Sequence, residues 1–340
     1  MEHVLHVLAV WYRTPMSHYA PLVAVSVTIF TVTALLSSKF GRGIQDIPNE
    51  RSLHSAPTPR IGGLGLMAGV LAGWGMLADI PAWWLLVPLV GLVAISLLDD
   101  IYSLPVSRRL LVQALAAVVV ITGLGVFTHI GVLVGLISLL LVVWLTNLYN
   151  FMDGANGLAG GMALFGFGFL GVAAWSAEDE VFAMMSFVVS TSAIGFLFFN
   201  FPKAKVFMGD AGSIPLGFLA AVFGVWGWMR GLWPVWFPFL VFSPFVVDAS
   251  VTLAKRGLRG AKVTEAHREH YYQRVIQMGL GHQNLALSEY VLMSAVGISG
   301  LVCLRQTYPW ALMVIWLMIY GALMIFIDLR WRRFLRVLTK

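Results

Sequence analysis

The stretch from Gly131 to Asn150, GVLVGLISLLLVVWLTNLYN, continues without a break into FMDGANGLAGG, which ends at Gly161. About 20 mostly apolar residues are enough for a helix to cross the hydrocarbon core of a bilayer. Asn147 and Asn150 close this apolar segment, and Asp153 follows three residues later. The stretch therefore predicts a transmembrane helix whose end carries polar groups at the membrane surface.

The composition of the whole chain predicts the same class of protein. Of its 340 residues, 59% are hydrophobic and only 11% are charged, whereas soluble domains contain about 25% charged residues. The mean hydropathy is +0.85. The single cysteine, Cys303, excludes a disulfide framework. We therefore expect an all-α polytopic membrane protein in which residues 1–340 form a single integral membrane domain.

Apolar segments separated by polar loops predict about eleven transmembrane helices. The expected ranges are 20–37, 61–78, 83–98, 110–128, 131–150, 157–175, 181–199, 214–229, 232–253, 287–304 and 308–327. Only Arg230 and Gly231 divide the eighth range from the ninth, so a single long segment there would change the number of spans.

Lysine and arginine are unevenly distributed between the two sets of alternate loops. The segments about 37–60, 99–109, 151–156, 200–213 and 254–286, together with 328–340, contain 19 of the 22 basic residues. Because positive residues favour the cytoplasmic side, we expect an outside N-terminus and a cytoplasmic C-terminus. The net charge of +6 follows from this bias, and we expect no nucleic-acid partner.

Acidic residues near the cytoplasmic loops predict an active site on that face. They include Asp99, Asp100, Asp153, Asp210 and Asp248. The alternative is an ion-coupled lipid or sugar transporter, but such a protein would carry carboxylates and broken helices near the bilayer midplane.

Asp99 and Asp100 stand side by side at the end of an expected span. Adjacent positions of a helix point about 100° apart, so we expect the two side chains to have different roles. They could also be solvated acids at a helix end. Arg109, close by, could receive a phosphate or anchor the next span.

Asn147, Asn150 and Asp153 recur at intervals of three, which places them on roughly one face of a helix. Amide and carboxylate oxygens suit Mg²⁺, which takes a few protein oxygens together with phosphate oxygens and water. Asn147 lies one turn deeper, and we expect it to hold neighbouring helices by hydrogen bonds.

In FPKAKVFMGDAGSIPLGF, Asp210 precedes a helix that we expect to start near Ser213–Pro215, where the helix dipole favours an anion. Phe207 is an aromatic residue on the same loop and is expected to pack in the core or to stack on a ring. The last loop is basic and could lie against anionic lipid. Its histidines do not have the HExxH spacing, which excludes a zinc protease of that type.

Five motifs resemble those of the polyprenyl-phosphate N-acetylhexosamine-1-phosphate transferases. In chain order they are PRIGG, the LDD pair, NxxNxxDGxNGLAGG, VFMGDxGS and HREHYYQR, and the resemblance extends from about Asn49 to Arg274. It implies a membrane transferase of ten or eleven spans in the bacterial inner membrane, with its active site on the cytoplasmic face. The implied reaction moves a sugar 1-phosphate from a UDP-N-acetylhexosamine to polyprenyl (undecaprenyl) phosphate and releases UMP. The implied cofactor is Mg²⁺, with Mn²⁺ as a possible substitute, and a homodimer is possible.

The resemblance also implies a role for individual residues. The catalytic residues would be Asp99, Asp100, Asp153 and Arg109; the metal ligands Asn150 and Asp210; the nucleotide-binding residues Phe207 and Asn156; and the residues at the sugar and its phosphate His267, Arg268 and His270.

The chain departs from the family pattern at three points, and the third bears on the substrate. Ser103 replaces the third acid of a DDxxD motif, and Asn156 stands where many members have aspartate. The sequence His-Arg-Glu-His replaces consecutive histidines, which argues against a muropeptide substrate. It is similar to the branch that starts O-antigen-type polysaccharides, whose donors include UDP-GlcNAc and 6-deoxy sugars such as UDP-FucNAc and UDP-QuiNAc.

The expected orientation can be tested by cysteine scanning with an impermeant thiol reagent. Positions 178–180 should react in intact cells, and positions 261–270 should react only after permeabilisation, because the basic residues predict that the second segment is cytoplasmic. The reverse labelling would overturn both the orientation and the location of the site.

Overall fold

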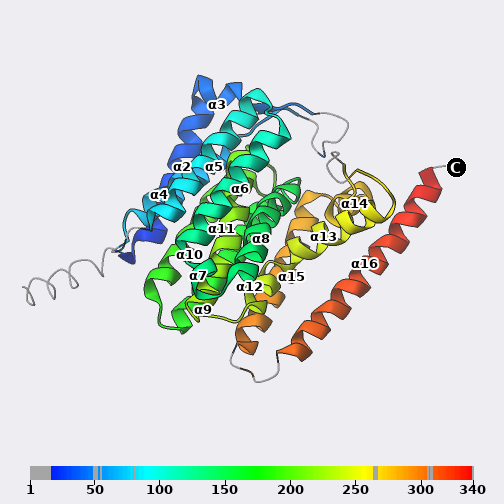
Figure 1. Ribbon diagram of the computed structural model, residues 1–340. Helices are drawn as coiled ribbons and strands as arrows, with labels where there is room; N and C mark the ends of the chain where they lie inside the picture. The colour runs from blue at the N-terminus through cyan, green and yellow to red at the C-terminus, as the bar shows by residue number, and fades with distance from the viewer. Residues whose placement is uncertain are drawn as a thin grey trace, which may run out of the picture.

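The computed structural model describes residues 17–48, 53, 56–77, 79, 81–262, 267–304, 306 and 309–338 (Figure 1). Positions 49–52, 54 and 55, where the family resemblance begins, lie outside these residues, as do positions 263–266. Nearly all of the described secondary structure is helical, which confirms the predicted all-α polytopic fold.

The described elements follow one another along the chain as a series of helices interrupted by one short strand pair. They are α2 (Ala20–Ser37), α3 (Lys39–Gly43), β1 (Gln45–Asp46), β2 (Thr58–Pro59), α4 (Gly62–Trp74), α5 (Trp83–Tyr102), α6 (Val106–Gly123), α7 (Val126–His129), α8 (Val132–Phe151), α9 (Leu158–Ser176), α10 (Glu180–Asn200), α11 (Asp210–Met229), α12 (Trp236–Val241), α13 (Ser243–Leu258), α14 (Tyr271–Gln277), α15 (His282–Cys303) and α16 (Trp310–Leu338). The strands pair antiparallel, with Gln45 opposite Pro59.

Nine of the described helices are long and apolar enough to cross a membrane: α2, α5, α6, α8, α9, α10, α11, α15 and α16. Two of the eleven expected spans, 61–78 and 232–253, are not single helices of this length. Helix α4 has 13 residues and so extends about 20 Å. The expected span 232–253 is divided at Phe242 into α12 and α13. Pro244, which has no N–H to donate, lies in the first turn of α13, where proline is tolerated.

The expected span 110–128 also has different limits. Helix α6 begins at Val106, directly after Pro105, and ends at Gly123. Gly125 has a φ of 70°, a left-handed conformation that suits glycine, and this turn separates α6 from the short α7.

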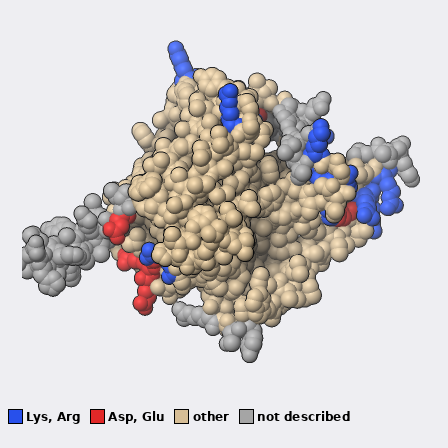
Figure 2. Space-filling view, in the orientation of Figure 1, with Lys and Arg blue, Asp and Glu red and all other residues tan. Residues whose placement is uncertain are grey.

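The helices alternate in direction, so that many of their polar ends meet at one end of the bundle, which we call the site end. The C-terminal ends of α5 and α8 lie there beside the N-terminal ends of α9, α11 and α15. Figure 2 shows basic side chains around the upper right of the molecule, where α14 and the end of α16 lie, and an acidic patch at the lower left.

Helix α11 is the central helix of the bundle. Its residues from Ala211 to Val225 are buried, and it packs against α4, α5, α8 and α9. Near its far end, Phe182, Phe223 and Trp226 form a cluster of aromatic rings. The burial of α11 fixes where its polar N-terminus emerges at the site end.

Two glycines allow α4 and α11 to come close at the site end. A Cβ added to Gly63 would lie 2.3 Å from the backbone nitrogen of Gly212. The Gly63 N–H also donates to the carbonyl oxygen of Met208 at 2.8 Å. The Gly-rich start of α4 therefore serves close packing beside the loop that leads into α11.

Replacing Gly63 by alanine should lower the free energy of unfolding by about 1–3 kcal/mol, because the added methyl overlaps backbone atoms that have little room to move. Thermal unfolding in detergent would measure the change. Gly91→Ala is the matched control, because a Cβ there meets open space, and alanine is the better helix residue. Equal effects of the two substitutions would contradict the role of the close contact.

Candidate active site

A polar cavity of about 150 Å³ lies at the site end, between the end of α8 and the start of α11. The predicted site residues that line it are Asn150, Asp153, Asn156, Phe207 and Asp210. The polar residues that line it without having been predicted are Asp46, Arg60, Asn200 and His282. The structure thus brings together residues from several loops that are distant in the sequence.

Asp100 is a cap for the central helix. Its carboxylate accepts hydrogen bonds from the backbone N–H of Asp210 at 3.5 Å and of Ala211 at 3.3 Å. Its side chain is only 2% exposed, and Arg60 lies 3.7 Å away. Helix α11 begins at Asp210, so the expected start near Ser213–Pro215 is wrong by one turn. The physical reason is the carboxylate of Asp100, which pairs with N–H groups that the first turn of a helix leaves free.

Asp99 has different partners from Asp100. Arg109 Nη1 lies 2.6 Å from one oxygen of Asp99 and 3.2 Å from an oxygen of Asp210. The other oxygen of Asp99 accepts the backbone N–H of Leu104 at 2.7 Å. The two adjacent aspartates thus serve different partners, as the 100° between them led us to expect.

The two asparagines at the end of α8 have different neighbours. Asn147 donates to Gln113 Oε1 of α6 at 2.6 Å, which confirms its predicted helix-packing role. Asn150 lines the cavity, and its Oδ1 accepts the hydroxyl of Ser213 at 2.7 Å. An amide oxygen has two lone pairs, so Asn150 retains one acceptor position for a ligand.

Phe207 and Asn156 line the cavity from different loops. The Phe207 N–H donates to the Pro59 carbonyl, and the Phe207 carbonyl accepts the Gly62 N–H, which fixes this loop to the PRIGG motif. The Asn156 N–H donates to Nδ1 of His282 at 3.3 Å. The other ring nitrogen of His282 lies 3.1 Å from the Leu53 carbonyl.

Only weak sequence signals pointed to the residues that we did not predict. Arg60 belongs to the PRIGG motif, which we had identified without assigning a role to the arginine side chain. His282 begins a span after a glycine. Asn200, at the end of α10, accepts the Gly157 N–H at 2.6 Å and so holds the turn between α8 and α9.

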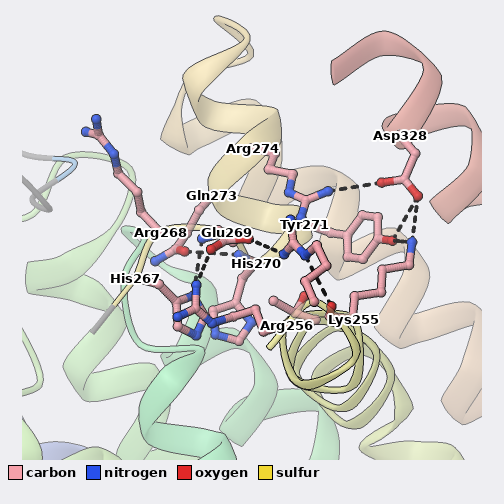
Figure 3. A network of polar contacts seen from close by, with 12 residues as sticks. Lys255, Arg256, His267, Arg268, Glu269, His270, Tyr271, Gln273, Arg274 and Asp328 are labelled. Carbon is pink, nitrogen blue, oxygen red and sulfur yellow. Dashed lines mark hydrogen bonds and ion pairs between the residues drawn. The ribbon is translucent and has the colours of Figure 1, made fainter. Parts of the chain in front are cut away.

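His267, Arg268 and His270, the three predicted residues of the last loop, do not line this cavity, and they are in different environments (Figure 3). Arg268 is exposed and points away from the ion pairs around it. His267 is half-buried. His270 is 2% exposed, lies between the rings of Phe151 and Tyr272, and places Nδ1 3.4 Å from Asp248. Their roles at the sugar and its phosphate therefore remain predictions.

Negative charge exceeds positive charge around the cavity. The five carboxylates of Asp46, Asp99, Asp100, Asp153 and Asp210 surround the two guanidinium groups of Arg60 and Arg109. Burial, and then the nearby carboxylates of Asp210 and Asp100, raise the pKa of Asp153 well above its usual value. Among the residues that the structure describes, no three His, Cys, Asp or Glu side chains are grouped into a complete metal site.

The fold and the cavity define a multi-pass membrane protein with a polar site at its helix ends. Residues 82–227 match the model of glycosyl transferase family 4. The chain is 29% identical over 293 residues, with 82% of each chain covered, to the probable undecaprenyl-phosphate N-acetylglucosaminyl 1-phosphate transferase of Bacillus subtilis. It is 28% identical over 344 residues to the decaprenyl-phosphate N-acetylglucosaminephosphotransferase of Mycobacterium tuberculosis, with 85% and 84% covered.

A further relative is the undecaprenyl-phosphate alpha-N-acetylglucosaminyl 1-phosphate transferase of Yersinia pestis, 25% identical over 306 residues with 82% of each chain covered. These matches confirm the resemblance to polyprenyl-phosphate N-acetylhexosamine-1-phosphate transferases that the five motifs predicted.

His267 offers a test of the loop that does not depend on activity. Burial, and then the neighbouring His270 and Arg256, lower the pKa of its imidazole to about 4. An unfolded chain binds this proton below about pH 6.5. The folded state therefore loses stability as the pH falls from about 6.5 towards 4.

The substitution His267→Gln should reduce the fall in melting temperature between pH 7 and pH 5, because glutamine does not titrate. Thermal unfolding in detergent at both pH values would measure it. The matched control is His129→Gln, at an exposed histidine distant in sequence from the loop. A fall as large as that of the wild type would contradict the burial of His267.

Proposed function

We propose that the protein transfers an N-acetylhexosamine 1-phosphate from a UDP-N-acetylhexosamine to undecaprenyl phosphate, with release of UMP. The reaction would take place at the cytoplasmic face of a bacterial inner membrane. The donor would be UDP-GlcNAc or a 6-deoxy sugar such as UDP-FucNAc or UDP-QuiNAc, and the product would start an O-antigen-type polysaccharide. The observation that carries the proposal is the cavity in which Asn150, Asp153 and Asp210 lie beside Phe207 and Asn156.

The donor nucleotide suits one side of this cavity. The half-buried ring of Phe207 offers a face on which uracil can stack. The side chain of Asn156 has both a donor and an acceptor for the edge of the base. The guanidinium of Arg60 lines the same cavity and suits the diphosphate, because charge-assisted hydrogen bonds to phosphate are strong.

A divalent cation such as Mg²⁺ fits the oxygen ligands that Asp210 and Asn150 offer in this cavity. Mg²⁺ takes one or two carboxylates together with substrate phosphate oxygens and water, so a complete cage of protein ligands is not required. Asp210 and Asn150 would supply protein oxygens, and the excess of carboxylates would favour a cation. When bound, the cation would neutralise charge on the diphosphate. Arg109 already lies at 3.2 Å from Asp210, so it would have to share that carboxylate.

The acceptor suits an apolar groove of about 170 Å³ between α8, α11, α12 and α13. Its lining is apolar almost throughout and includes Leu145 of α8. Leu145 precedes Asn150 by five residues, which is about 7.5 Å along a helix. A polyprenyl chain in this groove would therefore place its phosphate near the end of α8.

The chemistry is one phosphoryl transfer. An oxygen of the lipid phosphate attacks the donor phosphorus that carries the sugar, the bond to the UMP oxygen breaks, and UMP leaves. The second pKa of a phosphate monoester is near 6, so the nucleophile is largely ionised at neutral pH. When ionised, Asp153 is the best-placed acceptor for this last proton, because its raised pKa makes it a stronger base than an ordinary carboxylate. Asp99 is already paired with Arg109, and Asp100 caps α11.

The proposed reaction can be tested with purified protein in detergent, undecaprenyl phosphate and a panel of UDP-sugars. The measurements are released UMP and the masses of the lipid products. We expect one lipid diphosphate sugar and an equal amount of UMP with the correct donor. An ion-coupled transporter would bind a substrate but would release no UMP.

Substitutions of the two asparagines of α8 test the proposed metal-ligand role most directly. Asn150→Ala should lower kcat about a hundred- to thousand-fold, because one group that stabilises charge in the transition state contributes that much, and it should shift the Mg²⁺ dependence. Ser213→Ala is the matched control, since it removes the hydrogen bond to Asn150 but keeps the amide. Asn147→Ala should mainly lower thermal stability, because an interhelical hydrogen bond in a membrane averages about 0.6 kcal/mol.

A loss of activity in Ser213→Ala as large as that in Asn150→Ala would show that the hydrogen bond, rather than the amide oxygen, is what matters. Equal and Mg²⁺-independent losses in the two asparagine variants would show that this face of α8 is structural.

A further inference from the structure

The C-terminal helix α16 stands at one side of the bundle and contacts the rest of the described chain through a small apolar cluster and a few polar side chains (Figure 1). Trp316 Nε1 donates to Ser299 Oγ of α15 at 3.0 Å. The hydroxyl of Tyr320 lies 2.7 Å from Ser243 Oγ of α13. Two turns further along α16 is Asp328, the acidic residue of this helix.

Asp328 joins three elements at the site end (Figure 3). Its carboxylate lies 2.6 Å from Lys255 Nζ of α13 and 3.0 Å from Arg274 Nη1 of α14. The hydroxyl of Tyr271 donates to the same carboxylate at 3.3 Å. Only 8% of the Arg274 side chain is exposed, so this cation depends on Asp328 rather than on water for its compensation.

The short helix α14 that Asp328 holds also touches the predicted active site. Its N-terminus is capped by Asp248, which accepts the backbone N–H groups of Tyr271 and Tyr272 at 2.9 Å each. The hydroxyl of Tyr272 donates to the Phe151 carbonyl at 3.1 Å. A Cβ added to Gly154 would lie 2.2 Å from that hydroxyl, so α14 packs directly on the turn that carries Asp153.

Without its negative charge, residue 328 could no longer compensate the two cations beside it. Both Lys255 and Arg274 also lie over the ring of Tyr271, at 5.2 and 5.1 Å. Like charges held this close repel each other. The expected response is a shift of α14, which would move both the His267–His270 segment and the turn at Gly154.

We propose that Asp328 is a positioning residue for the transfer reaction, acting through Arg274, Tyr271 and α14 on the turn at Asp153 and on the His267–His270 segment. The inference rests on the proposed function, and it assigns a role to the C-terminal helix, which lies outside both the motifs and the matched family segment.

The test compares Asp328→Asn, which keeps the size of the side chain, with Asp328→Glu, which keeps its charge. The control is Arg332→Gln, which removes one charge from an exposed position on the same helix. We expect Asp328→Asn to lower kcat about tenfold or more, because small displacements of catalytic groups can cost up to about a hundredfold in rate. Its KM for UDP-GlcNAc should change less. Asp328→Glu should restore most of kcat, and Arg332→Gln should behave as the wild type.

A double-mutant cycle separates positioning from independent effects. Arg274→Gln should lower kcat by a similar factor, and the double variant with Asp328→Asn should be no slower than the worse single variant. Multiplicative losses would overturn the proposal. If Asp328→Asn does not fold, Tyr271→Phe replaces it in the cycle, because it removes one hydroxyl partner of the carboxylate and should give a smaller loss in the same direction.

Limited trypsin cleavage at the exposed Arg268 gives a readout that does not require turnover. Asp328→Asn should be cleaved about threefold faster or more than the wild type, since cleavage follows local opening of the segment. A wild-type cleavage rate in this variant would overturn the inference whatever the activity. A wild-type protein that releases no UMP, combined with faster cleavage of the variant, would instead reject the proposed function and leave the structural link intact.

Discussion

The carboxylate of Asp100 at the N-terminus of α11 is the interaction on which the site end depends. A buried charge is costly unless it is compensated, and here the compensation comes from two backbone N–H groups and Arg60. The same contact fixes where α11 begins, and therefore where Asp210 emerges beside the cavity. The fold and the site thus share one set of hydrogen bonds, and a substitution at Asp100 would disturb both.

Arg109, which belongs to α6, adds a third helix to this arrangement. It bridges Asp99 of α5 and Asp210 of α11, so one side chain joins two helices through charges that lie in the site. The cavity remains rich in carboxylates even with this arginine in place. The carboxylates leave a net negative charge in the site until a cation or a proton enters it. The raised pKa of Asp153 agrees with this excess of negative charge.

The sequence predicted the features that depend on local pattern. Apolar runs identified most spans within a few residues, and the difference between Asn147 and Asn150 followed from one helical turn. It could not predict the start of α11, because that start depends on Asp100, 110 residues earlier in the chain. The burial of His270 escaped prediction for the same reason: the rings that cover it come from α8 and α14.

The cavity and the apolar groove lie on different sides of α8, since Asn150 lines the first and Leu145 the second. One substrate of the proposed reaction would thus arrive from water and the other by lateral diffusion in the bilayer. The supply of acceptor is then set by its number per unit area of membrane, and diluting the membrane with inert lipid should slow the reaction even when total lipid substrate per volume is constant. Helix α8 would thus separate a substrate whose concentration is measured per volume of water from one whose concentration is measured per area of membrane.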